Sequence, residues 1–275
     1  MKKTAFCVKI NVYANALILH KEQFMVSRAE RTEDLAKNLK IYVSEAHIFT
    51  SDAIVLADFC APRHKDKCCD LGTGNGIIPL LWIRDFQPKE ITGVELSESA
   101  VNLFNKTLTE NNLKDKVNLI HRDLRDLKGV LPNEYYDIVS INPPYKKLGT
   151  GIVNEGEDYK NARHEFNCTL DDASKAASQL LKFGGRFCIC QRPERLPDIF
   201  AAMRKFKIEP KSMREVIQRV GKEPSLVLVE GKKGSAQGFR IYPPLILEDE
   251  TGKYTPEAEE LFNSYKYKEL LHNEV

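Results

Sequence analysis

Short apolar segments alternate with longer amphipathic segments between residues 68 and 206. Segments such as CCDL, EITGVEL and YYDIVSI are typical of buried strands, whereas SESAVNLFNKTLTENN has the spacing of a surface helix. This alternation predicts an α/β fold with a mostly parallel sheet and helices on both faces. SMREVIQRV and SLVLVEGKK follow each other without a helix between them, so we expect these two strands to pair antiparallel at one edge.

The same pattern gives the expected bounds of the elements. We expect strands at 68–71, 90–96, 117–120, 135–141, 186–191, 212–220 and 225–233. We expect helices at 50–59, 76–86, 97–112, 124–131, 195–206 and 169–185, the last of these ended by glycines. We place the main domain at 31–262, with a cap at about 31–62, an extension of uncertain structure at 1–30 and a tail at 263–275.

The composition is that of a soluble globular protein. The chain has 275 residues, of which 42% are hydrophobic and 29% charged, and no apolar run is long enough to cross a bilayer. The first residues are a poor signal peptide, because Lys9 and Asn11 interrupt the apolar stretch. The seven cysteines are odd in number and lack paired CxxC motifs, so we expect reduced side chains, no metal and a cytoplasmic location.

Charge is unevenly distributed along the chain, although the formal net charge is only +2. Residues 182–240 contain 14 Lys or Arg and 6 Asp or Glu, whereas residues 248–275 contain 3 Lys and 8 Asp or Glu. A basic excess in one segment is typical of a nucleic-acid contact. A basic surface that is merely solvated gives the same pattern, so charge alone leaves both interpretations open.

A glycine-rich loop follows the first strand of the alternating region. In CCDLGTGNGIIPLL, residues 68–81, Gly72, Gly74 and Gly76 can adopt backbone angles that a Cβ would forbid, and they let a ligand approach the main chain. A strand, glycine loop and helix place a ligand at the carboxyl edge of a parallel sheet. Asp70 ends the strand, where its carboxylate can meet a cationic or hydroxyl-bearing group.

Acidic residues also end the next two strands. Glu95 lies 25 residues beyond Asp70, where a carboxylate can accept hydrogen bonds from ribose hydroxyls. Asp123 follows the third strand, in a position to meet an adenine amine. Together with the glycine loop, these acids predict an adenosine-bearing cofactor.

The segment SINPPYKK, residues 140–147, ends another strand with a stiff corner, because prolines cannot donate to a β-ladder. The motifs DLGTGNG, VEL, RDL and NPPY, in this order, resemble those of S-adenosylmethionine-dependent methyltransferases with a Rossmann-like, seven-stranded core. In that class, NPPY faces the methyl group and occurs in enzymes that methylate adenine N6, cytosine N4 or the glutamine of release factors.

The resemblance implies S-adenosylmethionine as cofactor and assigns site residues by motif. The implied cofactor-binding residues are Asp52, Asp70, Gly72, Thr73, Gly74, Asn75, Gly76, Glu95, Leu96, Asp123, Leu124 and Asn142. The implied catalytic residues are Asn142, Pro143, Pro144 and Tyr145. Thr50 and Ser51 belong with Asp52 to a motif that lies near the cofactor's methionine end in the family.

The residue types of the corner suit methylation of a planar amine. The lone pair of such an amine is delocalised, so it attacks poorly. If Asn142 Oδ1 and the Pro143 carbonyl accept hydrogen bonds from the NH₂ group, its lone pair can turn toward the methyl group. The prolines hold these acceptors in place before the substrate arrives. Tyr145 offers a flat face on which an unstacked base can lie.

Motifs beyond NPPY narrow the resemblance. TSDAIVLADF, ARHE, RPERL, LVLVEGKKG and YPPLIL are similar to those of the bacterial family that methylates adenine N6 beside the anticodon of valine tRNA, over roughly residues 30–262. That similarity implies tRNA as partner. We expect no membrane contact, because no apolar run is long enough, and no stable protein partner. Candidate substrate contacts are Tyr145, Lys146, Lys147, Arg163, His164, Arg192 and Arg195, and further basic candidates are Arg204, Lys205, Lys232 and Lys233.

Other substrates remain open at this stage. Release-factor glutamine methyltransferases also use NPPY, but residues 1–60 look too short and mixed for their separate helical domain. DNA methylation normally needs a sequence-reading domain, and none is evident. A small-molecule methyltransferase and an RNA-binding protein without catalysis are further alternatives, although the intact Asn142 and glycine loop argue against the latter.

Overall fold

The computed structural model describes residues 30–143 and 168–262. Several expectations therefore lie outside the described residues. They concern the extension at 1–29 with Cys7, the tail at 263–275, and the site candidates Pro144, Tyr145, Lys146, Lys147, Arg163 and His164.

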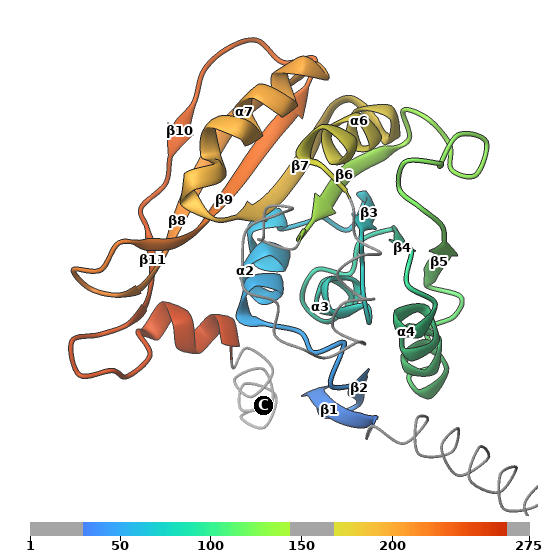
Figure 1. Ribbon diagram of the computed structural model, residues 1–275. Helices are drawn as coiled ribbons and strands as arrows, with labels where there is room; N and C mark the ends of the chain where they lie inside the picture. Colours follow the sequence, from blue (N-terminus) through green and yellow to red (C-terminus); the bar gives the residue numbers. More distant parts are fainter. Residues whose placement is uncertain (1–29, 144–167, 263–275) are drawn as a thin grey trace, which may run out of the picture.

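One large mixed sheet forms the centre of the described chain (Figure 1). Its strands follow the order β10-β8-β9-β7-β6-β3-β4-β5, and β11 also pairs with β8. Their bounds are β3 Lys67–Leu71, β4 Glu90–Glu95, β5 Val117–His121, β6 Tyr136–Ile141, β7 Leu181–Gln191, β8 Ile208–Arg219, β9 Pro224–Lys233, β10 Arg240–Ile241 and β11 Leu245–Glu248.

The sheet confirms the expected fold class. The strands from β3 to β7 run parallel, whereas β9 pairs antiparallel with both β7 and β8. The antiparallel pair predicted from the last two long apolar segments is therefore present. Two short strands that the sequence did not predict, β10 and β11, extend this side of the sheet by pairing parallel with β8.

Helices cover both faces of the sheet, as Figure 1 shows. One face carries α2 (Ser51–Cys60), α3 (Ile77–Asp85) and α4 (Glu98–Glu110), and the other carries α6 (Leu170–Leu180) and α7 (Leu196–Lys205). Each face has its own hydrophobic cluster, with Trp82 and Phe104 buried under the first and Phe187 and Met203 under the second. Within the described ranges, no helix is long and apolar enough to span a membrane.

An N-terminal hairpin packs against α4 next to the glycine loop. It consists of β1 (Arg31–Ala36) and β2 (Leu39–Val43), which pair antiparallel. The Asn111 side chain accepts from the Lys40 backbone N–H and donates to the Lys40 carbonyl, and the Tyr42 N–H donates to Thr107 Oγ1. These bonds satisfy backbone groups of the hairpin and fix it to the helix that follows β4.

The helix expected at 124–131 is wrong. The segment forms turns and one isolated bridge between Lys128 and Leu131. Gly129 has a φ of 78°, which is outside the helical region, and the Asp123 side chain accepts from the Arg125 backbone N–H. Local turn chemistry therefore competes successfully with the apolar spacing of this segment.

The expected end of the helix at 169–185 is also wrong. The α6 helix stops at Leu180, and β7 begins at Leu181, which is extended at φ −68° and ψ 135°. Leu181 is fully buried and pairs with Tyr136 of β6. Strand pairing and burial thus override the helical pattern before the glycines are reached.

Candidate functional site

The carboxyl edge of the parallel strands gathers the residues predicted from the motifs. Leu71 of β3 pairs with Val94 of β4 and with Ile141 of β6, and Glu95 pairs with His121 of β5. The segments that follow these strands are therefore neighbours at one edge. Because adjacent strands lie about 4.8 Å apart, the glycine loop and the corner after β6 begin side by side.

The glycine loop is held close to β4 by backbone hydrogen bonds. The Gly72 and Thr73 N–H groups both donate to the Val94 carbonyl, at 2.8 and 3.0 Å. Gly74 has a φ of 58°, and a Cβ built there would meet nothing within 4 Å. A Cβ on Gly76 would instead lie 2.1 Å from the Phe104 ring, so Gly76 serves packing while Gly74 faces open space.

Glu95 connects the glycine loop to the start of α4. Its side chain is only 6% exposed, and Oε2 accepts from the Gly74 N–H at 2.7 Å. Oε1 accepts from the backbone N–H groups of Leu96 and Ser97 at 2.9 and 2.8 Å. The carboxylate thus shapes the loop itself, and its expected contact with ribose hydroxyls stays a prediction.

Asp70 is a buried acid with unmet hydrogen-bonding capacity. The Ser140 hydroxyl donates to Asp70 Oδ1 at 2.6 Å. Within residues 30–143 and 168–262, Asp70 Oδ2 and the nearby buried Thr73 Oγ1 have no hydrogen-bond partner. Burial raises the pKa of Asp70 to about 7, although the nearby hydroxyls of Ser140 and Thr73 oppose this shift. A ligand that brings a cation or hydroxyl here would satisfy these atoms and favour the carboxylate.

Ser140 is a site residue that the motifs did not single out. It is fully buried in β6, and its hydroxyl orients one oxygen of Asp70 on the neighbouring strand. The available signal was a polar residue in the otherwise apolar run that precedes Asn142.

Some of the other predicted cofactor residues lie at the carboxyl edge of the sheet, and others are buried in the interior of the protein. Asn75 is buried, and its amide donates to the carbonyls of Tyr42 and His47, which anchors the N-terminal cap to the glycine loop. Asp123 binds the Arg125 side chain through both carboxylate oxygens, and this contact lowers the pKa of Asp123. Leu124 is buried in the core. Roles for these residues at a cofactor stay predictions.

The described part of the NPPY corner lies directly after β6. Asn142 is half-buried and Pro143 is buried, and both follow the strand that separates β3 from β7. The corner therefore stands between the glycine loop on one side and the Arg192 segment on the other.

Asp52 and Arg192 line one small cavity. This cavity lies on the β7 side of β6, whereas the glycine loop follows β3 on the other side of β6. This cavity of about 160 Å³ lies between the start of α2 and the ends of β8, β9 and β11. Arg192 Nη1 donates to the Ser225 carbonyl at 3.1 Å. Arg195 belongs to a 3₁₀ turn at Pro193–Arg195 and pairs with Asp198 at 2.7 Å.

The remaining basic candidates lie away from this edge, and most are paired. Arg204 contacts Glu209, Lys205 contacts Asp171, and Lys233 contacts Glu134. These ion pairs reduce the charge that each side chain offers to an RNA.

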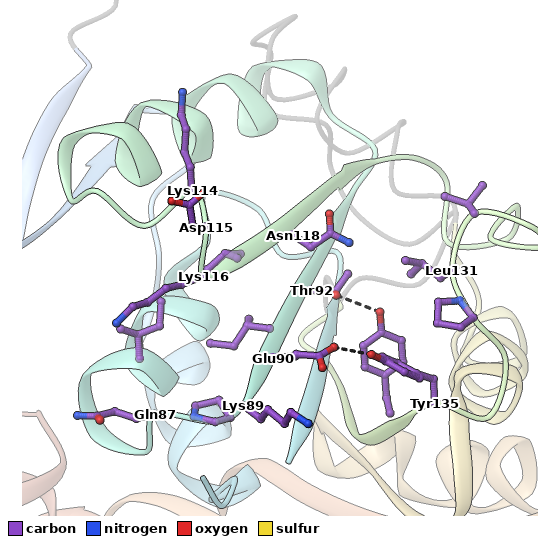
Figure 2. Close-up of a pocket in the computed structure, with 17 residues that line it drawn as sticks. Gln87, Lys89, Glu90, Thr92, Lys114, Asp115, Lys116, Asn118, Leu131 and Tyr135 are labelled. Atoms are coloured by element: carbon purple, nitrogen blue, oxygen red, sulfur yellow. Dashed lines mark hydrogen bonds between the residues drawn. The ribbon is translucent and has the colours of Figure 1, made fainter. Parts of the chain in front are cut away.

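A larger cavity, of about 840 Å³, opens at the amino edge of the sheet (Figure 2). Two pairs of its polar side chains are bound to each other, because Tyr135 donates to Glu90 and Tyr136 donates to Thr92. Figure 2 shows Lys114 and Gln87 pointing away from these contacts. Volume alone therefore does not mark the site.

The carboxyl edge fits an organic cofactor. Gly74 leaves room for a ligand against the main chain, and Asp70 and Thr73 supply unmatched oxygens beside it. Among the described residues, no group of three or more His, Cys, Asp or Glu side chains could hold a metal ion.

Comparisons with known proteins agree with this geometry. A Porphyromonas gingivalis protein named tRNA1(Val) (adenine(37)-N6)-methyltransferase is 26% identical over 200 residues, 71% of this chain and 76% of that protein. A Tolumonas auensis protein of the same name is 26% identical over 216 residues, 75% of this chain and 84% of that protein.

The fold also has solved counterparts. A structure described as a predicted O-methyltransferase of Agrobacterium tumefaciens superposes with a TM-score of 0.64 at 22% identity, covering 78% of this chain and 96% of that one. Residues 41–195, more than half of the chain, match the methyltransferase small domain. The chain therefore belongs to the methyltransferase small-domain family.

Proposed function

We propose that this chain transfers the methyl group of S-adenosylmethionine to N6 of an adenine in tRNA, near the anticodon. The observation that carries this proposal is the register of β3 with β6. Because Leu71 pairs with Ile141, the glycine loop and Asn142 start from neighbouring strand ends. A cofactor on the loop and a substrate amine at Asn142 can therefore meet.

The chain offers distinct groups for each end of the cofactor. Gly74 lets the ligand approach the main chain, and Asp70 and Thr73 supply oxygens for its polar groups. Glu95 and Asp123 follow the next two strands, where ribose hydroxyls and an adenine amine would be bound. When bound, S-adenosylmethionine supplies an electrophilic methyl group.

Asn142 and Pro143 orient the attacking nitrogen. Asn142 Oδ1 and the Pro143 carbonyl accept hydrogen bonds from the N6 amine, which turns its lone pair toward the methyl group. The N6–CH₃ bond forms as the S–CH₃ bond breaks, and the amine then loses a proton to water. Rigid placement of the two acceptors before substrate arrival lowers the barrier.

The names of the similar proteins support tRNA as substrate. Proteins named tRNA1(Val) (adenine(37)-N6)-methyltransferase align with 71 to 78% of this chain, and the aligned share of those proteins is 76 to 85%. Arg192 and Arg195, which follow β7 beside the corner, are the basic residues best placed to contact RNA. The odd number of cysteines and the lack of paired CxxC motifs support a reducing cytoplasmic location for the reaction.

The test is methyl transfer from labelled S-adenosylmethionine to total bacterial tRNA, to a release factor and to duplex DNA. Nucleoside analysis of the tRNA product should yield N6-methyladenosine, with little label in the other two substrates. Label in the release factor but not in tRNA would retain the chemistry of the corner and overturn the proposed substrate.

A further inference from the structure

The small cavity beside Arg192 has the anatomy of a base-binding pocket. Its walls include the buried side chains of Val55, Val216, Leu226 and Leu247. Its volume of about 160 Å³ is below the roughly 300–1,000 Å³ of sites for drug-sized ligands, so it suits one planar ring rather than a longer ligand. An apolar wall with a few polar groups at the mouth is the usual arrangement of a small ligand site.

Three polar side chains with complementary chemistry line the cavity. Asp52, at the start of α2, supplies a half-buried carboxylate. Arg192 supplies a planar guanidinium held by the Ser225 carbonyl. The Gln218 amide is oriented by donating to Glu248 Oε1 at 2.6 Å.

The pocket lies next to the proposed catalytic corner, on the side away from the glycine loop. Arg192 follows β7, which is the immediate neighbour of β6, and Val216 lies on β8, two strands further. Of the residues that line the pocket, Arg192 is therefore the one nearest to Asn142 in the strand order, because it follows the strand beside the one that ends just before Asn142. A nucleotide next to one whose base sits at Asn142 can reach it.

We propose that this pocket, through Asp52, Arg192 and Gln218, binds the base of a nucleotide adjacent to the target adenine and prefers a base with an exocyclic amine. This inference rests on the proposed function. The guanidinium gives the base a flat surface, as in other single-stranded RNA sites. The Asp52 carboxylate accepts from the exocyclic amine of adenine, cytosine or guanine, whereas uracil has no exocyclic amine and places a carbonyl oxygen, which the carboxylate repels, at that position.

This assignment differs from the cofactor role that the family resemblance gives Asp52. The difference is testable because the two roles affect separate quantities. A base contact sets which RNA context is methylated, whereas a cofactor contact sets the affinity for S-adenosylmethionine or its product.

The experiment uses the full chain and a set of RNA stem-loops that differ only in the nucleotide on the 5′ or 3′ side of the target adenine. Values of kcat/KM are measured for wild type, Asp52→Asn and a control, Asp115→Asn, which makes the same change at the amino edge. Affinity for S-adenosylhomocysteine and Tm are measured for each protein.

We expect wild type and the control to prefer an amine-bearing base over uracil by about 10- to 100-fold at one of the two positions. Asp52→Asn should bring this ratio close to one, because an asparagine amide can also donate to uracil. Its affinity for S-adenosylhomocysteine should stay within about twofold of wild type.

Three results would overturn the inference. Equal use of all neighbouring bases by wild type would exclude the pocket as a base reader. A preserved preference in Asp52→Asn, together with weaker S-adenosylhomocysteine binding, would return Asp52 to the cofactor site. If the enzyme methylates no RNA at all, the proposed function is wrong as well. In the first two outcomes the enzyme still methylates RNA, so only the inference about the pocket fails.

Discussion

Two carboxylates, one near each edge of the sheet, differ in their hydrogen-bond partners and in the direction of their pKa shifts. Asp70 of β3 lies near the carboxyl edge, and its Oδ2 has no partner in the described part of the chain. Asp137 of β6 lies near the amino edge, where it is paired with Lys182 and accepts from the Lys67 backbone N–H. The pKa of Asp70 is raised to about 7 by burial. Burial alone would also raise the pKa of Asp137, but the bonds from Lys182 and Lys67 lower it below its ordinary value.

The difference shows how the functional edge can be recognised. The amino edge has the larger cavity, yet Glu90, Tyr135 and Tyr136 have hydrogen-bond partners there. The carboxyl edge keeps buried oxygens without partners, which is costly unless a ligand satisfies them. Unmet hydrogen-bonding capacity, rather than cavity volume, therefore favours the carboxyl edge as the candidate site.

The largest effect is expected from Asn142→Ala. The change removes one of the two proposed acceptors for the substrate amine, so kcat should fall about 100- to 1,000-fold while cofactor affinity stays near wild type. Single-turnover methyl transfer and S-adenosylhomocysteine binding measure the two quantities. Asn118→Ala, in the amino-edge cavity, is the matched control and should leave both unchanged. An active Asn142→Ala enzyme would contradict the role of the corner.

The pH dependence of stability should separate the two acids. Asp70 binds a proton in the folded state up to pH of about 7 but only to about 3.8 when unfolded, so its contribution to the free energy of unfolding declines across that interval. The full decline is up to about 4 kcal/mol. Denaturant unfolding of Asp70→Asn at several pH values should lack this decline.

Asp137→Asn should change the pH dependence of stability in the opposite direction. Because the pKa of Asp137 is lowered in the folded state, its stabilisation is present above the ordinary carboxyl pKa and is lost as the pH falls through the folded value. The variant should lose stability at neutral pH and little at low pH. Parallel pH profiles for the two variants would show that the contrast between the edges is wrong.

The local parts of this site could be read from sequence, whereas its long-range contacts could not. The glycine loop and the strands that flank it depend on residues close in the chain, and β3, β4 and β6 fall where the apolar segments predict. Ser140 was missed because its partner, Asp70, lies 70 residues away. The hydrophobic periodicity of a sequence predicts strands, but it does not predict which side chains two parallel strands bring together.

The errors in the elements have similar causes. At 124–131, the apolar spacing suits a helix, but Gly129 and the Asp123 side chain favour turns. At Leu181, pairing with Tyr136 starts a strand inside a helical pattern. The grouping of Asp52 with Arg192 depends on how α2 crosses the sheet, which composition and motifs do not encode.

A smaller effect is expected from Gly74→Val. Its side chain would enter the open space over the loop, so S-adenosylhomocysteine affinity should fall about 10- to 100-fold. Gly129→Val is the matched control, because Gly129 also has a positive φ and open space around its Cβ position. Both variants carry similar backbone strain of about 1–2 kcal/mol, so Tm should fall alike. Equal cofactor affinity in two folded variants would reject the loop as the binding site.

The smallest effect is expected from reversing surface charge at the two edges. Arg192→Glu with Arg195→Glu, beside the catalytic corner, should weaken tRNA binding about tenfold and reduce the salt dependence of binding by about one to two counterions. Lys114→Glu with Lys116→Glu makes the same change in net charge at the amino edge. Filter binding at several salt concentrations should show little effect of this second pair. If both pairs weaken binding equally, tRNA responds to the net charge of the protein. A difference between the pairs would mean that the RNA lies along the carboxyl edge, which also carries the proposed cofactor site.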